Sequence, residues 1–217
     1  MNKTLPALVC LLAASAHAQA SFPVFPLAIA VAEDAGAPVV TDAWLEGEIA
    51  QANAIFAPSG VSFEQRSRRA LDARFARLET RADRHALGAE MTPSMVNVFI
   101  VLSLRDVDDP TQVRRGVHWR PAEMPGAHFV VVASVAGPDV LAHELGHFFG
   151  NQHSETPNDV MSYLRDGTIV PFFERAEIAQ IRRHAHRFRA RGEISAEADP
   201  TQVHRSGSLG TPAGVSE

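Results

Sequence analysis

One stretch of the chain, HELGHFFGNQH from His143 to His153, constrains the fold more than any other. If its first part is helical, His143 and His147 are four residues apart and project from one face on successive turns. Both imidazoles can then reach a single ion. A helix that continued would carry His153 away from that ion. Gly150 is placed to end the helix, because glycine adopts the left-handed conformation at little cost. The chain can then turn back and bring His153 in as a third ligand.

Three imidazoles with an open fourth position are the arrangement of a catalytic zinc site. We therefore predict one Zn²⁺ ion held by His143, His147 and His153. Glu144 follows the first ligand and would face the bound water. Zinc lowers the pKa of that water to about 7, and Glu144 would act as the general base that takes its proton during attack on a carbonyl group. The alternative of surface histidines on a packed helix is disfavoured, because three His, one Glu and one Gly rarely occur together at these offsets.

Hydrophobic periodicity predicts a chain that alternates strands and helices. The run at residues 95–104 is nearly all apolar and indicates a central strand. Residues 151–170 lack periodicity and are expected to form a loop. We expect further strands at residues 27–31, 61–64, 117–119 and 128–134, and helices at residues 42–56, 66–90, 138–149 and 174–190. The first of these helices would be capped by Thr41 or Asp42.

Two predicted helices are rich in basic residues. In residues 66–90, Leu71, Phe75 and Leu78 have helical spacing, and the arginines would form a solvated face or, alternatively, an anion site. In the final helix, the outward Arg and His residues would form a solvated face or, alternatively, a metal or nucleic-acid patch. A solvated face is favoured in both helices, because acidic residues are interspersed among the basic ones and because runs of charged residues are usually exposed to solvent.

The first twenty residues resemble a secretory signal. Lys3 precedes an apolar run that starts at Leu5, and small residues precede Ala18 and Ala20. We predict a signal peptide at residues 1–20, removed after Ala20 or Ala18, and therefore a secreted or periplasmic protein. The apolar run is shorter than the ~20 residues that span a bilayer, which disfavours a membrane anchor. Cys10 is the only cysteine, so the mature chain would contain no disulfide.

Composition limits the number of domains and the classes of partner. With 46% hydrophobic and 21% charged residues, the chain is typical of soluble globular proteins. Its length suits one domain, which we place at residues 21–194, while the polar residues 195–217 are expected to form a disordered tail. The net charge of −5 gives no electrostatic reason to expect nucleic acid or an anionic membrane as a partner.

The motif resembles the signature of the metzincin clan of zinc peptidases, HExxHxxGxxH followed by a methionine turn. Met161 follows within NDVMSY, and the resemblance implies that it lies beneath the zinc site as a hydrophobic floor. Tyr163 is similar to the tyrosine that astacin-like and serralysin-like members place near the metal, where it binds the metal or the developing oxyanion. A tyrosine packed in the core remains the alternative. Ser154 is similar to matrixins, whereas Met161 and Tyr163 point to astacins, serralysins or pappalysins, so the subfamily stays open.

The resemblance also implies a fold and an activity. The fold would be of the α/β (α+β) class, a mixed twisted sheet of about five strands with an active-site helix and a C-terminal helix. The cleft would lie between the zinc helix and an edge strand near residues 117–120, with substrate antiparallel along that edge. The implied activity is that of a secreted zinc metalloendopeptidase acting on protein or peptide substrates.

Two other functions remain open. The chain could be a non-catalytic zinc-binding module that recognises a partner, although holding zinc does not need Glu144. It could also be a zinc hydrolase of a non-peptide amide. Because few residues separate the predicted signal from the first predicted strand, we expect no prosegment. Activity would then be restrained by a protein inhibitor or by narrow specificity.

Overall fold

The computed structural model describes residues 23–167, 169–195 and 197–198. The predicted signal peptide and residues 199–217 of the predicted tail lie outside the described residues. The helices are α1 Asp42–Phe56, α2 Arg81–Ala86, α3 Val140–Phe148 and α4 Arg175–Ala190, with single turns of 3₁₀ helix at Ala57–Ser59, Ala73–Phe75 and Leu87–Glu90. The strands are β1 Pro23–Asp34, β2 Ala37–Pro38, β3 Ser62–Leu71, β4 Arg77–Leu78, β5 Val96–Val101, β6 Ser103–Arg105, β7 Val113–Arg114, β8 Gly116–Trp119, β9 Phe129–Ala133 and β10 Glu197–Ala198.

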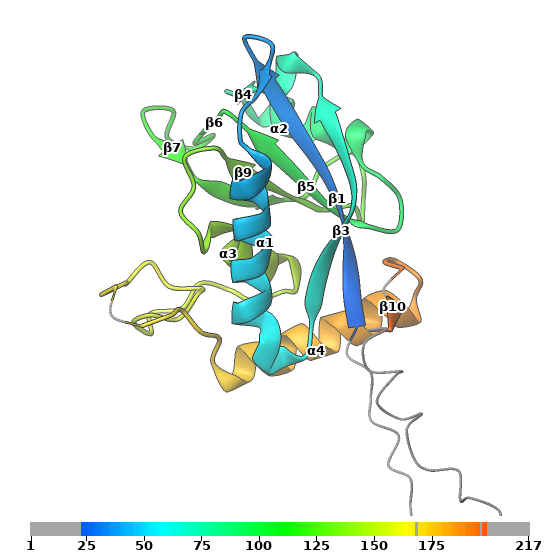
Figure 1. The fold of residues 1–217 in the computed structure, drawn as a ribbon, viewed down its shortest axis with the longest axis vertical. Helices are drawn as coiled ribbons and strands as arrows, with labels where there is room; N and C mark the ends of the chain where they lie inside the picture. The colour runs from blue at the N-terminus through cyan, green and yellow to red at the C-terminus, as the bar shows by residue number, and fades with distance from the viewer. Residues whose placement is uncertain (1–22, 168, 196, 199–217) are drawn as a thin grey trace, which may run out of the picture.

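One mixed sheet forms the centre of the molecule (Figure 1). Strand β1 pairs in parallel with β3 on one side and with β5 on the other, and β5 pairs in parallel with β9. Strand β8 runs antiparallel to β9 and forms the edge of the sheet. The short strands β2 and β10 add antiparallel pairs to β1, and β4, β6 and β7 form a separate three-stranded sheet. The predicted fold class is confirmed.

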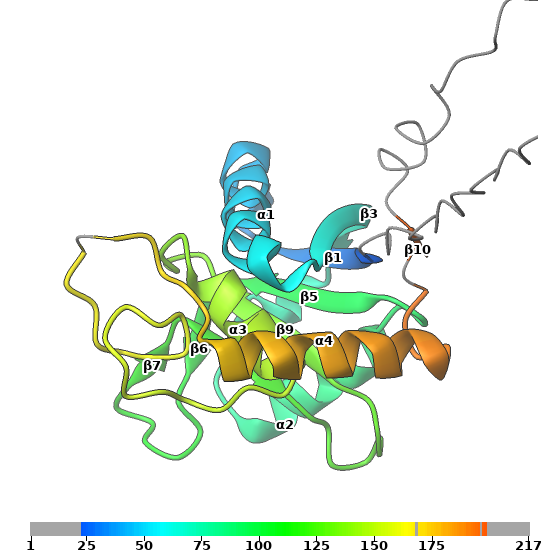
Figure 2. The same cartoon turned by 90° about the horizontal axis from the view of Figure 1, so that it is seen from below.

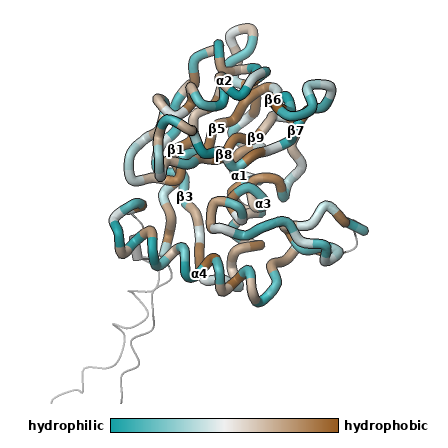
Figure 3. Tube along the Cα trace, turned by 180° about the vertical axis from the view of Figure 1, so that it is seen from behind, coloured by the Kyte–Doolittle hydropathy of each residue, from teal (hydrophilic) through white to brown (hydrophobic). Residues whose placement is uncertain are grey.

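Both faces of the sheet are buried, which explains why its central strands are apolar throughout. In β5, Val96, Val98 and Ile100 face one core, while Phe99 and Val101 face the other. The first core also receives the apolar residues of α1, α3 and α4, and the second contains Leu87. Figure 2 shows α1 and α2 on opposite sides of the sheet. Hydrophobic segments accordingly concentrate in the strands of Figure 3.

Most predicted elements are confirmed. The strands expected at residues 27–31, 117–119 and 128–134 lie in β1, β8 and β9, and the strand expected at residues 95–104 is β5 followed by β6. The helix that begins at Asp42 is capped by Thr41, whose hydroxyl accepts the N–H of Trp44 at 3.2 Å. Residues 151–167 form a loop with isolated bridges only. In the predicted tail, Glu197 and Ala198 pair with the start of β1.

The helix predicted at residues 66–90 is wrong. Strand β3 continues to Leu71, and the rest of the segment contains β4, α2 and two turns of 3₁₀ helix. The cause is tertiary, because β3 pairs with β1 from Ser62 to Leu71, and ladder pairing overrides weak helical propensity. Phe75, in a turn of 3₁₀ helix, and Leu78, in β4, are still buried, and both lie in the second core.

The arginines of this segment form separate ion pairs instead of one anion site. Arg68 pairs with Asp42, Arg69 with Glu90 and Arg77 with Asp34. These pairs support the interpretation of a solvated charged surface. Among the described residues, no helix is both long enough and apolar enough to cross a membrane.

Candidate metal centre

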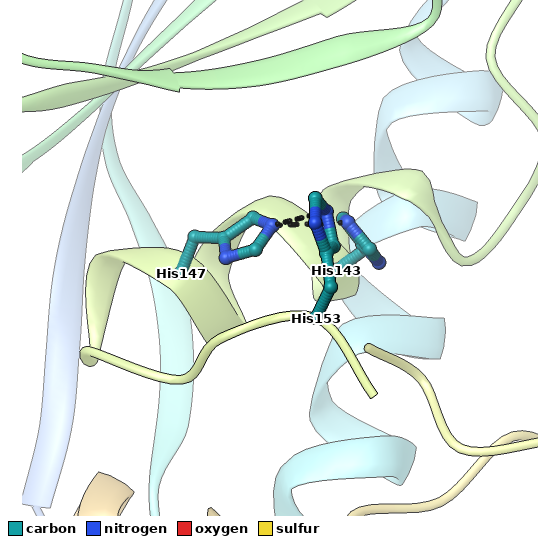
Figure 4. A group of neighbouring side chains, drawn as sticks. All are labelled: His143, His147 and His153. Carbon is teal, nitrogen blue, oxygen red and sulfur yellow. Dashed lines mark hydrogen bonds between the residues drawn. The ribbon is translucent and has the colours of Figure 1, made fainter. Parts of the chain in front are cut away.

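Three imidazoles converge at the C-terminal half of α3. His143 and His147 project from the helix, and His153 comes from the loop that follows it (Figure 4). The Nε2 atom of His147 lies 3.1 Å from Nε2 of His143 and 3.1 Å from Nε2 of His153. Zinc with imidazole nitrogens at about 2.0–2.1 Å in a tetrahedral shell would separate those nitrogens by about 3.3 Å. The donor set therefore fits a zinc ion. It is the one such cluster of His, Cys, Asp or Glu among the residues that the structure describes.

Backbone carbonyls orient two of the rings. Nδ1 of His143 lies 2.7 Å from the carbonyl oxygen of Val160, and Nδ1 of His147 lies 2.9 Å from that of Asn151. A ring N–H that donates to a carbonyl leaves Nε2 unprotonated and directed at the ion. Burial lowers the pKa of His143 to about 4, which keeps the imidazole in its neutral, metal-binding form at neutral pH.

Gly150 lies where the chain turns back from α3. Its φ of +91° is in the left-handed region that favours glycine. The N–H of Gly150 donates to the carbonyl of His147, and the N–H of Asn151 donates to that of Gly146, which closes the end of the helix. A Cβ at Gly150 would also lie 2.5 Å from Cε1 of His184 on α4. Any larger residue here would be strained by this φ and would have to displace the side chain of His184.

Met161 lies against α3. Its side chain is fully buried in the first core and contacts Gly146 of α3. The turn that carries it is fixed by Asp159, whose carboxylate accepts the N–H of Met161 at 2.8 Å. Next to it, the carbonyl of Val160 is the acceptor for His143. The methionine turn thus supports both the helix and one ligand ring.

Glu144 points from α3 toward β8. It is 6% exposed, and its carboxylate accepts the backbone N–H of His118. Burial raises the pKa of Glu144 to about 8, against the hydrogen bond and the charge of Arg114, which both lower it. A carboxyl group with a pKa near the working pH can accept and release a proton, as a general base must.

Tyr163 lies at the mouth of the site. Its side chain is 70% exposed, and its hydroxyl lies 2.8 Å from Nε2 of His153. This exposure is inconsistent with the alternative of a tyrosine packed in the core. The hydroxyl is therefore available to a group that approaches the metal position.

A cleft runs between α3 and the free edge of β8. It consists of two cavities, of about 470 and 440 Å³, that share Arg114, Gly116, His143, Glu144 and Tyr163. The first extends toward Arg165, and the second toward Trp119 and Arg120. This is the cleft that the sequence places between the helix and the edge strand.

Two residues of the site, Gly116 and Arg114, were not predicted from the sequence. Gly116 begins β8 close to α3, and a Cβ there would lie 2.8 Å from Oε1 of Glu144. Arg114 lines both cavities. Burial lowers the pKa of His153 and the charge of Arg114 lowers it further, while the same charge opposes the rise in the pKa of Glu144 that burial causes. Neither Gly116 nor Arg114 belongs to a local motif. A glycine at the start of a predicted edge strand was the one signal available.

The basic face of α4 makes contacts within the protein. Arg182 donates to the carbonyls of Pro58 and Ser59, and so joins α4 to the end of α1. The side chain of Gln180 bonds both Arg183 and His184. Within the described part of the chain, the histidines of α4 form no second metal cluster.

No protein-family model and no curated protein sequence matches the chain. The chain does match solved structures in fold. Mature mirolysin of Tannerella forsythia, in complex with a cleaved peptide, has a TM-score of 0.56 at 10% identity over 78% of this chain and 97% of that one. Metalloproteinase-II from Bacteroides fragilis has a TM-score of 0.54 at 10% identity, and the match covers 76% of this chain and 53% of that one. Archaemetzincin from Methanopyrus kandleri has a TM-score of 0.50 at 16% identity, and the match covers 75% of this chain and 96% of that one.

These similarities concern the fold, and the three-histidine site of this chain lies within that fold. The described chain carries a mixed sheet, a helix with two histidines, a glycine turn and a third histidine, in that order. The chain therefore has the fold of metzincin-like metallopeptidases.

Proposed function

We propose that the chain is a secreted zinc metalloendopeptidase that hydrolyses peptide bonds in the cleft between α3 and β8. The observation that carries the proposal is the convergence of three Nε2 atoms beside the buried carboxyl group of Glu144. Metallopeptidases among the structures of similar fold support the same class of reaction. Export rests on the signal-like residues 1–20 of the sequence.

Each residue then has a distinct task. His143, His147 and His153 would hold the ion, which when bound supplies a Lewis acid and lowers the pKa of water. Glu144 would accept the proton of the attacking water and pass it to the leaving amine. The hydroxyl of Tyr163, beside His153, would donate to the oxygen on which negative charge develops.

The free edge of β8 would hold the substrate. Among the described strands, β8 pairs with β9 only, so backbone groups on its other side could pair with an extended peptide. Gly116 and His118 on this strand also contact Glu144, so a peptide bound there would lie next to the proposed general base. A peptide is therefore a better fit than a compact amide substrate.

The test is cleavage of a proteome-derived peptide library by the purified zinc-loaded protein, with and without chelator. We expect cuts that disappear with chelator. Glu144→Gln should keep one zinc by elemental analysis and lose about 10²–10⁴-fold in kcat/KM, because it removes only the base. Glu46→Gln, on the exposed face of α1, is the matched control and should behave as wild type.

Two results would contradict the proposal. Full turnover in Glu144→Gln would overturn the role of the base. A protein that binds zinc but yields no chelator-sensitive cuts would instead be a binding module or a hydrolase of another amide.

A further inference from the structure

The cavity on the Arg165 side of the cleft is basic. Three arginines line it, Arg114, Arg115 and Arg165, against two acids, Asp139 and Glu144. The cavity has a volume of about 470 Å³, which is enough for one long side chain of a substrate. The charge of the cavity should therefore influence which substrate side chain binds in it.

Two of the three arginines are neutralised within the protein. Nε of Arg114 donates to the carboxylate of Asp106 at 2.6 Å, and Asp106 is 4% exposed. Arg165 pairs with Asp139 at 2.9 Å and donates to the carbonyl of Val160 at 3.0 Å. Both guanidinium groups are thus fixed in the cavity wall, and Asp139 offers no free negative charge to a ligand.

Arg115 differs from these two. Among the described residues, no carboxylate forms an ion pair with its side chain, which is exposed at the rim of the cavity. Its backbone is fixed, because its carbonyl accepts the N–H of Ala133 on β9 at 2.8 Å. The rim of the cavity therefore holds one positive charge with no internal partner. The remaining acid, Glu144, is buried and bonded to β8.

The direction of β8 decides which substrate residue meets this charge. The strand runs from Gly116 to Trp119. A peptide that pairs with it in the antiparallel sense places residues before the scissile bond near Trp119, and residues after it near Gly116. The basic cavity then receives the side chain that follows the scissile bond.

We infer that this cavity selects substrates with Asp or Glu immediately after the scissile bond, and that Arg115 is the specificity-determining residue. The inference rests on the proposed function, since it names the substrate class of the same site. A carboxylate at this position would complete an ion pair with Arg115. Lysine or arginine there would instead meet a like charge.

The experiment compares three peptides that differ only in having Glu, Gln or Lys after the cleaved bond. For the zinc-loaded wild type we expect kcat/KM for Glu to exceed that for Gln by about fivefold, as partly exposed charge pairs allow. Arg115→Ala should remove this ratio, and Arg115→Glu should make Lys the best substrate. Raising the salt concentration should reduce the wild-type ratio, because screening weakens an exposed ion pair.

Two control variants carry the same change of charge. Arg189→Glu, on α4 beside a different surface hollow, should leave the Glu-to-Gln ratio unchanged. Arg120→Glu, at the Trp119 end of the cleft, should alter preference before the scissile bond and not after it. If Arg120→Glu changed the preference after the bond, the peptide would run the other way and the assignment would be overturned.

The outcomes separate the inference from the proposed function. Metal-dependent cleavage without an acidic preference, or with a preference that Arg115→Glu leaves intact, would overturn the inference alone. Absence of any metal-dependent cleavage by the wild type would overturn the proposed function and the inference with it.

Discussion

At the scale of single residues, Glu144 and Tyr163 line the same cleft in very different surroundings. Glu144 is buried against β8, whereas Tyr163 is 70% exposed at the mouth of the cleft. Burial tunes a proton acceptor, because it raises the pKa of a carboxyl group. Exposure instead leaves a phenol free to bond a substrate atom. The two side chains therefore suit two different steps of hydrolysis.

We predict that Tyr163→Phe lowers kcat by roughly 10–10³-fold with little change in KM, because a donor to the oxyanion acts mainly in the transition state. Phenylalanine keeps the ring, and Tyr163 contributes little to the core. The change in thermal stability should therefore be small. Steady-state kinetics beside thermal melts and zinc analysis would test this. Unchanged kcat in a variant that retains zinc would exclude the oxyanion role.

The site residues that could be predicted from the sequence are those that lie close together along the chain, at a spacing that fixes their geometry. His143, His147, Gly150 and His153 fall within one helical turn and one reversal, so their geometry follows from the helix period. Gly116 and Arg114 come from strands β8 and β7, which are distant in the sequence, and their approach to Glu144 depends on how α3 packs on β8. Spacing carries no information about such contacts.

At the scale of elements, the start of the active-site helix is held by its neighbour. The N–H of Leu141, in the first turn of α3, donates to the carboxyl group of Glu48 on α1. Asp139 precedes the helix but makes no side-chain cap. The first N–H groups of a helix lack internal partners, so Glu48 supplies an acceptor from another element. Glu48 is 4% exposed, and burial raises its pKa to about 7, with a further contribution from the charge of Asp139.

This shift predicts a pH dependence of stability with a definite sign. The folded-state pKa of Glu48, about 7, lies above its ordinary value of 4.5, so the folded protein binds the proton more tightly. The resulting stability is complete below pH about 4.5 and is lost as the pH rises to about 7. The loss amounts to at most about 3 kcal/mol in the free energy of unfolding.

Glu48→Gln removes this titration while keeping the shape of the neutral acid. We expect wild type to lose stability relative to Glu48→Gln between pH 5 and pH 8, measured by urea unfolding with zinc in excess. The histidine ligands titrate in both proteins, so their effect cancels in the comparison. Glu46→Gln, exposed on the same helix, should show no such divergence. A difference between wild type and Glu48→Gln that stays constant with pH would show that Glu48 is not perturbed.

Elements were predictable where one chain segment decides its own structure. Strand β5 and helix α4 are such cases. A strand buried on both faces is apolar throughout, and a helix buried along one stripe has apolar residues at helical spacing, so both patterns can be recognised in the sequence. The start of β3 lies in the strand predicted at residues 61–64, but the rest of it was missed because seven consecutive residues, Glu64 to Ala70, are exposed and show no alternation. Its conformation comes from the hydrogen-bonding ladder with β1, which leaves no hydrophobic pattern in the sequence.

At the scale of the whole molecule, regular structure on one side of the cleft contrasts with the loop on the other. The sheet and α3 are joined through the first core, whereas the segment after Gly150 has isolated bridges and few backbone bonds. Met161 and Phe173 anchor this loop in the core, and the N–H of Ser154 donates to the carbonyl of Met161 at 3.1 Å. His153 belongs to the same loop. A metal ion on the three histidines would therefore join the loop to α3.

We predict that removing zinc lowers the melting temperature by about 8–16 °C. Zinc at 1,000 times its dissociation constant contributes about 4 kcal/mol, and each kcal/mol shifts Tm by about 2–4 °C in a domain of this size. Calorimetry with and without chelator measures the shift, and His153→Ala should abolish most of it because two imidazoles make an incomplete site. Hydrogen exchange should then show protection lost in the loop after Gly150, while β5, buried on both faces, remains protected. If chelator left Tm unchanged, or if protection fell equally in β5, the ion would not be the link between the loop and α3.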